Sequence, residues 1–253
     1  MISKNQIKLI KQLNQKKVRQ REGLFVAEGP KVVGDLMKYL RPQAVFATAD
    51  YITPLGCDHI ERITAEELRR ISFLQHPQQV LALFPLPPIA AIDSVVSLDR
   101  LTLALDGVQD PGNLGTIIRL ADWFGIESIV CSEDTADAWN SKVVQATMGS
   151  IARVNIAYGD LLQVVSSLPS DYPVYGTLLD GDNLYSQPLS SHGMIIMGNE
   201  SRGLSETIRR RINRRLLIPS YRQSDTAESL NVAIATAIVC AEFRRRGSGC
   251  PLP

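Results

Sequence analysis

Three polar segments that contain glycine are the parts of this chain whose residues could do chemistry. They run over Asp106–Arg119, Gly198–Leu204 and Ile218–Val232. The first two follow short apolar runs that are typical of buried strands, and the third begins where another predicted strand ends. Because open α/β sheets bind ligands at the carboxyl ends of their strands, we expect a ligand site where these segments meet.

The first segment leaves a strand through turn residues and enters a helix. Asn113 is a good helix N-cap, and Gly115 and Arg119 lie four residues apart on one helical face. A glycine at that position leaves room for a ligand to approach the guanidinium. The same pattern is equally typical of an ordinary capped helix with a surface arginine, and periodicity does not choose between the two.

The second and third segments each join a turn to a polar group. Glu200 is either a charge held for binding or a cap for the helix that begins near Ser205. Ser229 is the predicted N-cap of a closing helix, whose exposed amides and positive dipole end suit a carboxylate or a phosphate. Small residues along this helix allow another helix to approach closely, in the core or across a dimer interface: Ala233, Ala235, Ala237 and Ala241.

The elements that must position these segments alternate between strand and helix. The predicted strands are Leu101–Leu105, Ser128–Cys131, Ile151–Ile156, Val174–Leu179, Met194–Met197 and Leu216–Ile218. The predicted helices are Leu114–Phe124, Lys142–Met148, Leu161–Leu168, Glu206–Arg211 and a last one from Ser229. Such alternation predicts an α/β fold, a parallel sheet with helices on both faces.

The N-terminal part predicts a smaller α/β domain of its own. Helices are expected around Ile7–Leu13, with a lysine-rich outer face, after Gly29-Pro30, and near Glu66–Ile71; strands are expected at Leu24–Ala27, Ala44–Thr48 and Val80–Phe84. Residues 85–98 are proline-rich at their start and lack periodicity, which suits a linker. We therefore predict a domain over 1–84, a linker over 85–98 and a second domain over 99–253.

The formal net charge of +1 conceals three clusters of cations. The first holds Lys4, Lys8, Lys11, Lys16, Lys17, Arg19 and Arg21; the second Arg209, Arg210, Arg211, Arg214 and Arg215; the third Arg244, Arg245 and Arg246. Clustered cations gain affinity for a phosphate-rich partner because they release its condensed counterions. Each cluster alone is also compatible with a solvated surface.

The remaining composition excludes several classes of protein. The four cysteines, Cys57, Cys131, Cys240 and Cys250, show no paired spacing, so neither a zinc site nor a disulfide framework is predicted. The lysine-rich start is not followed by an apolar stretch, and no run approaches the length of a membrane span. We expect a soluble, cytoplasmic protein.

Taken together, the three segments resemble the motifs of the SpoU (TrmH-like) RNA methyltransferases of the SPOUT superfamily. The matching patterns are Asn-x-Gly-x-x-x-Arg from Asn113, Gly-x-Glu-x-x-Gly-Leu from Gly198, and Ile218-Pro219 followed by Ser-Leu-Asn-Val from Ser229. They occur in the family's order and cover roughly residues 100–246. The N-terminal part is also similar to the substrate-binding domain that precedes many of these enzymes.

This resemblance implies transfer of a methyl group from S-adenosyl-L-methionine to a ribose 2′-hydroxyl in RNA. Ribosomal RNA is the favoured substrate, transfer RNA the other candidate, and no metal is implied. It further implies a homodimer whose C-terminal chain forms a deep trefoil knot, with the N-terminal domain binding RNA. Knots are rare enough that general topology rules would have excluded one.

The family's functional residues carry over to matching positions of this chain. The resemblance assigns the polar catalytic cluster to Asn113, Arg119, Glu200, Ser229 and Asn231. It assigns the cofactor pocket to Gly198, Ile218 and Leu230, largely through main-chain contacts, with Thr177 at a neighbouring strand end as a further candidate.

Arg119 is the base that the family's mechanism proposes, and we favour a different role. An arginine side chain normally keeps its proton well above neutral pH, so it is a poor base. A sugar hydroxyl must instead be positioned in line with the sulfonium methyl group while it loses its proton. Our hypothesis is that Arg119 holds the target phosphate and stabilises the developing alkoxide, while the proton leaves through the RNA phosphate or water.

The third segment departs from the family pattern. After Ile-Pro the family usually has Met and, two positions later, Gly, where this chain has Ser220 and Arg222. About three extra residues precede Glu228, and Ala233 replaces a frequent serine. The resemblance therefore assigns no function to the loop Ser220–Ala227.

Two other functions are compatible with parts of the sequence. A noncatalytic RNA-binding or ribosome-assembly protein that retained the fold would explain the altered third motif, but not the intact Asn113, Arg119, Glu200 and Asn231. A dinucleotide oxidoreductase would explain the alternating elements, but the chain lacks Gly-x-Gly-x-x-Gly and the acidic residue expected about twenty positions later.

Overall fold

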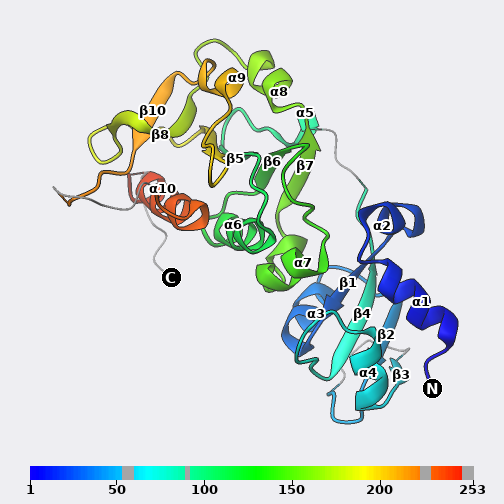
Figure 1. Ribbon diagram of the computed structural model, residues 1–253. Coiled ribbons are helices and arrows are strands. Elements are labelled where there is room, and N and C mark those ends of the chain that lie inside the picture. Colours follow the sequence, from blue (N-terminus) through cyan, green and yellow to red (C-terminus); the bar gives the residue numbers. More distant parts are fainter. Residues whose placement is uncertain (53–59, 89–91, 223–228, 247–253) are drawn as a thin grey trace. The chain divides into compact units, whose positions relative to one another are not determined.

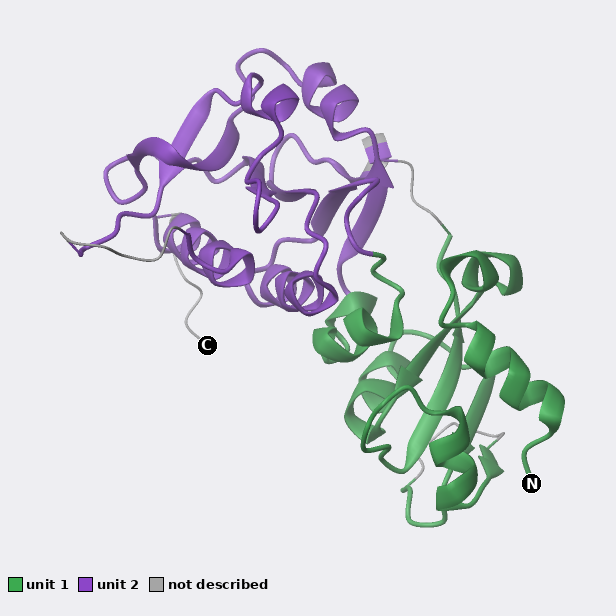
Figure 2. Cartoon of the chain, viewed as in Figure 1, with its two compact units in different colours: residues 1–88, 137–152 green, residues 89–136, 153–253 purple. Residues whose placement is uncertain are grey.

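The computed structural model describes residues 1–52, 60–88, 92–222 and 229–246. The chain folds into two compact units, drawn in different colours in Figure 2. Unit 1 contains residues 1–88 together with 137–152, and unit 2 contains residues 89–136 and 153–253. The chain therefore enters unit 1 a second time, in the middle of the segment that builds unit 2.

Two of the helices of unit 1 begin with a capping box. Ser3 and Gln6 form a reciprocal capping box at the start of α1 (Lys4–Gln12), and Thr64 and Glu67 do the same for α4 (Ala65–Ile71). The remaining helices of the first pass are α2 (Lys16–Glu22) and α3 (Pro30–Met37). α2, which the sequence pattern did not predict, ends at Gly23 in the left-handed conformation.

The sheet of unit 1 is mixed and has the order β1-β4-β2-β3. Its strands are β1 (Leu24–Glu28), β2 (Ala44–Ala47), β3 (Ile60–Arg62) and β4 (Val80–Pro85). β4 pairs antiparallel with β1 and β2, and β2 pairs parallel with β3. Nearly every residue of β1 and β4 is buried, so these two strands form the centre of the core.

Residues 137–152 complete unit 1 with α7 (Ser141–Thr147) and a 3-10 turn, Ser150–Ala152. The ring of Trp139 packs on Phe25 of β1, with 4.8 Å between the ring centroids. Arg19, which is 2% exposed, forms an ion pair with Asp137 and donates hydrogen bonds to the carbonyl oxygens of Leu13 and Asn14. Arg19 is thus a buried structural cation, although the sequence placed it in a cluster suited to RNA.

Unit 2 is built on a six-stranded sheet in which every pair of neighbours is parallel, in the order β10-β8-β9-β5-β6-β7. The strands are β5 (Leu101–Asp106), β6 (Ser128–Ser132), β7 (Asn155–Gly159), β8 (Val174–Asn183), β9 (Gly193–Gly198) and β10 (Arg214–Leu217). β5 and β9 are apolar along almost their whole length, as expected for central strands that are covered on both sides.

Helices cover both faces of this sheet (Figure 1). α6 (Pro111–Trp123) and α10 (Val232–Arg246) pack on each other, and α5 (Ile92–Val95), α8 (Leu161–Ser167) and α9 (Glu206–Arg209) lie on the opposite side. The predicted fold class, a parallel sheet with helices on both faces, is confirmed. Among the described helices, none combines the length and the apolar character needed to span a membrane.

Several boundaries differ from the sequence predictions for physical reasons. Residues 151–156 were expected to be one strand, but Met148 and Gly149 both have positive φ and reverse the chain there. Ile151 consequently packs within unit 1, and the strand β7 begins only at Asn155. The predicted linker also contains structure, since β4 extends to Pro85 and α5 lies within residues 85–98.

The domain boundaries predicted from the sequence are continuous, whereas the compact units are not. Residues 137–152 lie inside the predicted domain 99–253 but pack with residues 1–88. The division into a substrate-binding domain, a linker and a methyltransferase domain stays a prediction, with bounds at 1–84, 85–98 and 99–253. Cys57 and Cys250 lie outside the described residues.

We expect the buried carboxyl group of Glu28 to make the stability of unit 1 depend on pH. Its carboxylate is buried, accepts hydrogen bonds from Ser72 Oγ and Phe73 N, and has a pKa raised above its ordinary value because burial disfavours the charge. A raised carboxyl pKa stabilises the folded state at low pH, and this stabilisation is lost as pH rises through the folded-state pKa. We expect the free energy of unfolding to fall over that range, and Glu28→Gln to remove this part of the dependence.

Urea unfolding at several pH values, followed by the fluorescence of Trp139 in a Trp123→Phe background, measures this effect. Glu66→Gln is the control because Glu66 is exposed. Identical pH dependence in the wild type and Glu28→Gln would contradict the prediction.

Candidate active site

The three segments singled out from the sequence come together within unit 2. Asp106–Arg119 follows β5 and forms most of α6, Gly198–Leu204 follows β9, and the third segment follows β10 and leads into α10. β5 and β9 are neighbours in the sheet and run in the same direction, so their carboxyl ends lie side by side. The expectation that these segments meet at a sheet edge therefore agrees with the structure.

The start of α6 differs from the prediction. The N-cap is Asp110, whose Oδ1 accepts a hydrogen bond of 2.8 Å from the backbone N of Asn113. Pro111 occupies the first helical position, which tolerates proline because the N–H there has no helical partner. The Asp-Pro pair was the signal for this start in the sequence. Because Asn113 is not the cap, its side chain is available for other contacts.

A chain of hydrogen bonds joins the three segments through Asn113. Its Nδ2 donates to Oε1 of Glu200 at 2.9 Å, and its Oδ1 accepts from Nδ2 of Asn231 at 2.9 Å. Asn231 Oδ1 in turn accepts from the backbone N–H groups of Ala233 and Ile234, at 3.0 and 3.2 Å. We call this the Asn231–Asn113–Glu200 relay. It runs from the N-terminus of α10 to a carboxylate of the second segment.

The relay also corrects the predicted cap of the last helix. Asn231, not Ser229, accepts the hydrogen bonds that satisfy the first amides of α10. Ser229 is exposed, and no described residue forms a hydrogen bond with its side chain. Glu228 and most of the loop Ser220–Ala227 lie outside the described residues.

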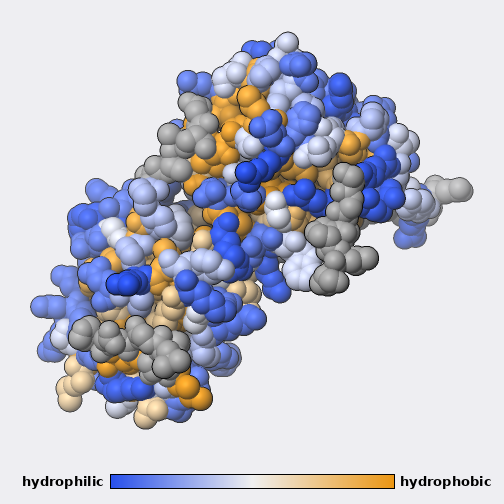
Figure 3. All heavy atoms as spheres, turned by 180° about the vertical axis from the view of Figure 1, so that it is seen from behind, coloured by the Kyte–Doolittle hydropathy of each residue, from blue (hydrophilic) through white to orange (hydrophobic). Residues whose placement is uncertain are grey.

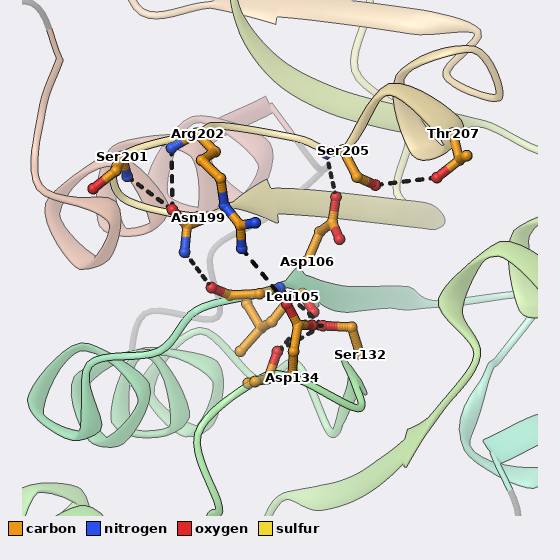
Figure 4. Close-up of polar contacts among 11 residues, drawn as sticks. Leu105, Asp106, Ser132, Asp134, Asn199, Ser201, Arg202, Ser205 and Thr207 are labelled. Carbon is orange, nitrogen blue, oxygen red and sulfur yellow. Dashed lines mark hydrogen bonds and ion pairs between the residues drawn. The ribbon is translucent and has the colours of Figure 1, made fainter.

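The loop of the second segment is held by Asn199, which the sequence analysis did not select. Asn199 Oδ1 accepts hydrogen bonds from the backbone of Ser201 and Arg202, both at 3.0 Å, and Nδ2 donates to the carbonyl of Gly107 at 2.7 Å (Figure 4). Gly198 must be glycine here, because a Cβ would lie 2.5 Å from the backbone N of Leu204. These contacts fix the turn that carries Glu200.

Further hydrogen bonds tie the same loops to the ends of β5 and β6. Asp106 Oδ2 accepts from Ser205 N at 2.6 Å, and Ser132 Oγ accepts from Gly107 N at 2.8 Å (Figure 4). Ser132 Oγ also donates to Asp134, which lies 3.8 Å from the guanidinium of Arg202. The loops around the relay are thereby cross-connected before any ligand binds, which favours a preorganised site.

Arg119 differs from the relay residues in its surroundings. Its side chain is exposed on α6, and within the described part of the chain it forms no hydrogen bond or ion pair. Gly115, one turn earlier on the same helix, is buried. The guanidinium is therefore available to an anionic ligand. In the free protein Arg119 is a surface arginine, which was one of the two interpretations that the sequence allowed.

Three of the four residues predicted to bind the cofactor lie on adjacent strands or directly after one, but Thr177 is not at a strand end as predicted, because β8 continues to Asn183. Thr177 lies in β8, Gly198 ends β9 and Ile218 directly follows β10. Thr177 Oγ1 donates to the carbonyl of Ile196 at 3.4 Å, and Gly198 is buried. Leu230, next to Asn231 in the relay, keeps 50% of its surface exposed.

This set fits S-adenosyl-L-methionine in chemical character. Ile218 and Leu230 provide apolar surface that is not fully buried, which suits an adenine ring, and backbone groups at the strand ends can bind its polar edge. A carboxylate of the ligand would suit the amide-rich turns there. The described cavity of about 310 Å³ lies elsewhere, over the ends of β5, β6 and β7, and none of these four residues lines it.

The thiols near this sheet are not nucleophiles. Cys131 and Cys240 are free and buried, and burial raises the pKa of each thiol to about 12, so both stay protonated at neutral pH. Within the described ranges, no group of three or more His, Cys, Asp and Glu side chains could hold a metal ion. The chemistry offered by the described site is that of amides, one carboxylate and one guanidinium.

Two family models match the chain, one in each half. The model described as the SpoU rRNA methylase family matches residues 100–241 and includes all three segments. The chain belongs to the SpoU rRNA methylase family. The model described as the MRM3-like substrate binding domain matches residues 4–82.

Curated members of the family resemble this chain along most of its length. The 23S rRNA (guanosine(2553)-2′-O)-methyltransferase RlmP of Bacillus subtilis is 32% identical over 252 residues, which cover 96% of this chain and 97% of the relative. The 23S rRNA (guanosine-2′-O-)-methyltransferase RlmB of Neisseria meningitidis is 31% identical over 150 residues, which cover 58% of each chain.

Solved structures of SpoU and TrmH proteins share the fold. A structure from Porphyromonas gingivalis, assigned to the TrmH family of RNA methyltransferases, superposes with a TM-score of 0.85 at 41% identity and covers 98% of this chain and 100% of its own. An rRNA methyltransferase from Sinorhizobium meliloti, solved with bound S-adenosylmethionine, has a TM-score of 0.82 at 28% identity and covers 98% of both chains.

These similarities confirm the family, the enzyme class and the cofactor that the sequence predicted. The SpoU protein is a methyltransferase that uses S-adenosyl-L-methionine. The roles of individual residues stay predictions.

The relay can be tested by a substitution that keeps its shape. In Asn113→Asp the new carboxylate could still accept from Asn231, but it would face Glu200 instead of donating to it. Two adjacent carboxylates cannot both ionise cheaply, so one carboxyl pKa rises and the folded state loses stability as pH increases. We expect the melting temperature of this variant to fall further below that of the wild type at pH 8 than at pH 5.

Differential scanning calorimetry of the wild type and the variant at the two pH values measures the effect. Asn155→Asp is the matched control, because Asn155 is exposed at the start of β7 in the same unit. A destabilisation of equal size at both pH values would mean that Asn113 and Glu200 are not in contact.

Proposed function

We propose that this SpoU protein transfers the methyl group of S-adenosyl-L-methionine to a ribose 2′-hydroxyl of ribosomal RNA. The observation that carries the proposal is the relay, which brings Asn113, Glu200 and Asn231 from three distant segments into one connected group. These are three of the five side chains that the resemblance assigns to the catalytic cluster. The named ribosomal RNA targets of the two curated relatives support this substrate over transfer RNA.

Arg119 acts, in this proposal, as an anchor for anionic RNA and not as a base. Its guanidinium is exposed on α6 and has no ion-pair partner among the described residues, so a phosphate can reach it. An arginine that keeps its proton attracts a phosphate and stabilises an alkoxide as the hydroxyl proton leaves. The proton passes to the RNA phosphate or to water.

The relay positions the remaining catalytic groups. Glu200 accepts from Asn113, so its carboxylate is fixed in direction and keeps lone pairs for a ribose hydroxyl. Asn231 anchors the start of α10 to the same amide. Exposed Ser229 adds a hydroxyl two residues before Asn231. Bound S-adenosyl-L-methionine supplies an electrophilic methyl group, and its binding is assigned to Thr177, Gly198, Ile218 and Leu230.

The N-terminal domain is the proposed RNA-binding module, and residues 99–253 are the proposed catalytic module. Lys4, Lys8 and Lys11 are exposed at helical spacing on α1, so they form one cationic face. Arg19 is excluded from that face by its burial. The match of residues 4–82 to a substrate-binding domain supports this assignment.

We also infer a homodimer that forms through α10. Ile234, Ala237, Ile238 and Ala241 repeat at helical spacing and are exposed or half-buried, with 54% of Ile234 accessible. The stripe includes Ala237 and Ala241, two of the small residues that the sequence left open between core and interface, whereas Ala233 is buried in the core. The trefoil knot and a cytoplasmic location complete the proposal; the free thiols Cys131 and Cys240 suit a reducing compartment.

Incubation with radiolabelled S-adenosyl-L-methionine and ribosomal RNA from cells that lack this protein tests the proposed reaction. We expect label to be incorporated at one or a few riboses, mapped as sites resistant to alkaline cleavage. RNA from cells that contain the protein is the control, because it is already methylated. Cofactor binding without methyl transfer to any RNA would favour the noncatalytic alternative.

The same assay distinguishes the two roles of Arg119. We expect Arg119→Lys to lower the rate of methyl transfer by about 100-fold, the cost of a lost transition-state contact, without changing the shape of the pH–rate profile. A titration that is present in the wild type and absent from Arg119→Lys would show that Arg119 is the base.

The proposed dimer predicts a change of mass on substitution. Ile234→Arg places a charge in the apolar stripe, so we expect the protein to become monomeric in light scattering coupled to gel filtration. Leu179→Arg is the control, since Leu179 is 74% exposed on β8 outside the stripe. A wild-type monomer, or a variant that stays dimeric, would contradict this interface.

A further inference from the structure

Some arginines of the three cationic clusters form hydrogen bonds and ion pairs within the protein, whereas others face solvent. Arg244 donates to the carbonyl oxygens of Phe124 and Gly125 and so satisfies the C-terminal end of α6. Arg245 and Arg246 both bind the buried Glu242, and their hydrogen bonds hold the pKa of that carboxyl at about 2. The C-terminal cluster is therefore structural, as is Arg19 in the first cluster.

The second cluster is exposed except for Arg209, which is half-buried. It comprises Arg209, Arg210, Arg211, Arg214 and Arg215, which lie on α9, on the turn after it and on β10; we call it the α9–β10 strip. Three carboxylates are its neighbours: Asp180 and Asp182 on β8, and Glu206 on α9. The strip therefore keeps an excess of positive charge in a chain whose net charge is only +1.

Among the described residues, the ion pairs of the strip leave two arginines without an acidic partner. Arg209 and Arg215 share the single carboxylate of Asp180, and Arg210 pairs with Glu206 at 3.0 Å. Arg214 is exposed and donates to the carbonyl of Asn213 beside it. Arg211 is exposed, and no ion pair with a described residue involves it. Both guanidinium groups remain available to an anion.

The backbone beneath the strip is firmly held. Asn213 accepts a hydrogen bond of 2.9 Å from Val174 N and donates one of 2.9 Å to the carbonyl of Tyr172. Ile212 packs so closely over Gly176 that a Cβ there would lie 2.8 Å from Ile212 Cγ1. A cationic surface on a fixed backbone loses less conformational entropy on binding than one on a free loop.

We propose that the α9–β10 strip binds the phosphate backbone of the RNA substrate outside the nucleotide that is methylated. This inference rests on the proposed function for the identity of the polymer. A row of guanidinium groups spaced along a strand and a helix suits a polyanion better than a single small anion. The strip adds sequence-independent affinity, while the site around the relay selects the reacting ribose.

β10 lies at the edge of its sheet, which offers a different use for the same charges. Charged side chains on an edge strand also prevent strands of other molecules from pairing with it. The two uses differ in one measurable property. Phosphate binding changes how RNA affinity depends on salt, whereas protection of an edge does not.

Filter binding of a 23S rRNA transcript at a series of salt concentrations tests the strip. We expect Arg211→Gln and Arg214→Gln each to weaken binding several-fold near 0.1 M salt and to lower the slope of log affinity against log salt by about 0.7 to 0.9. Arg214→Lys keeps the charge and should retain the wild-type slope. Arg100→Gln is the control, because Arg100 is exposed in the same unit and pairs with Glu127.

Calorimetric binding of S-adenosyl-L-methionine shows that each variant is folded, since the strip lies outside the predicted cofactor residues. Slopes of Arg211→Gln and Arg214→Gln equal to that of Arg100→Gln would overturn the proposal and leave edge protection as the use of these arginines. A wild type that binds RNA but transfers no methyl group would refute the proposed function, while the salt slopes would still decide whether the strip binds phosphate.

Discussion

The amide of Asn113 is the contact on which the arrangement of the site depends. It donates to Glu200 and accepts from Asn231, so one side chain connects a helix start, a strand-end turn and the N-terminus of α10. Each of these groups would otherwise need its own partner. The first amides of α10 require a cap, which Asn231 provides with its Oδ1, while its Nδ2 donates to Asn113 Oδ1. The same group of hydrogen bonds thus caps α10 and holds together the residues that we propose for catalysis.

The arginines of this chain have three different environments. Arg19 is buried and bonds with backbone carbonyls and Asp137, and Arg244 satisfies the end of α6. Arg119 and the arginines of the α9–β10 strip face solvent. On the face drawn in Figure 3, hydrophilic side chains cover most of the surface and smaller apolar patches lie between them, so surface composition alone does not mark a binding site. The hydrogen-bond and ion-pair partners of each guanidinium group instead show which arginines are free to bind a ligand.

The chain passes through unit 1 twice, so the two units are joined by more than one backbone connection. Residues 137–152 leave the sheet of unit 2 after β6, pack Trp139 against Phe25, and return to form β7. Removal of the N-terminal residues would therefore expose an apolar segment of the remaining chain.

The sequence by itself determined the parallel α/β sheet, the family and the cofactor, because strand periodicity and short motifs are local properties of the chain. It also placed Asn113, Glu200 and Asn231 in one site through their motifs. Tertiary structure alone decided that Asn113 connects Glu200 to Asn231, that residues 137–152 belong to unit 1, and which arginines are buried. Those outcomes depend on which distant group satisfies each hydrogen bond or charge, and residue spacing carries no information about partners that are a hundred positions away.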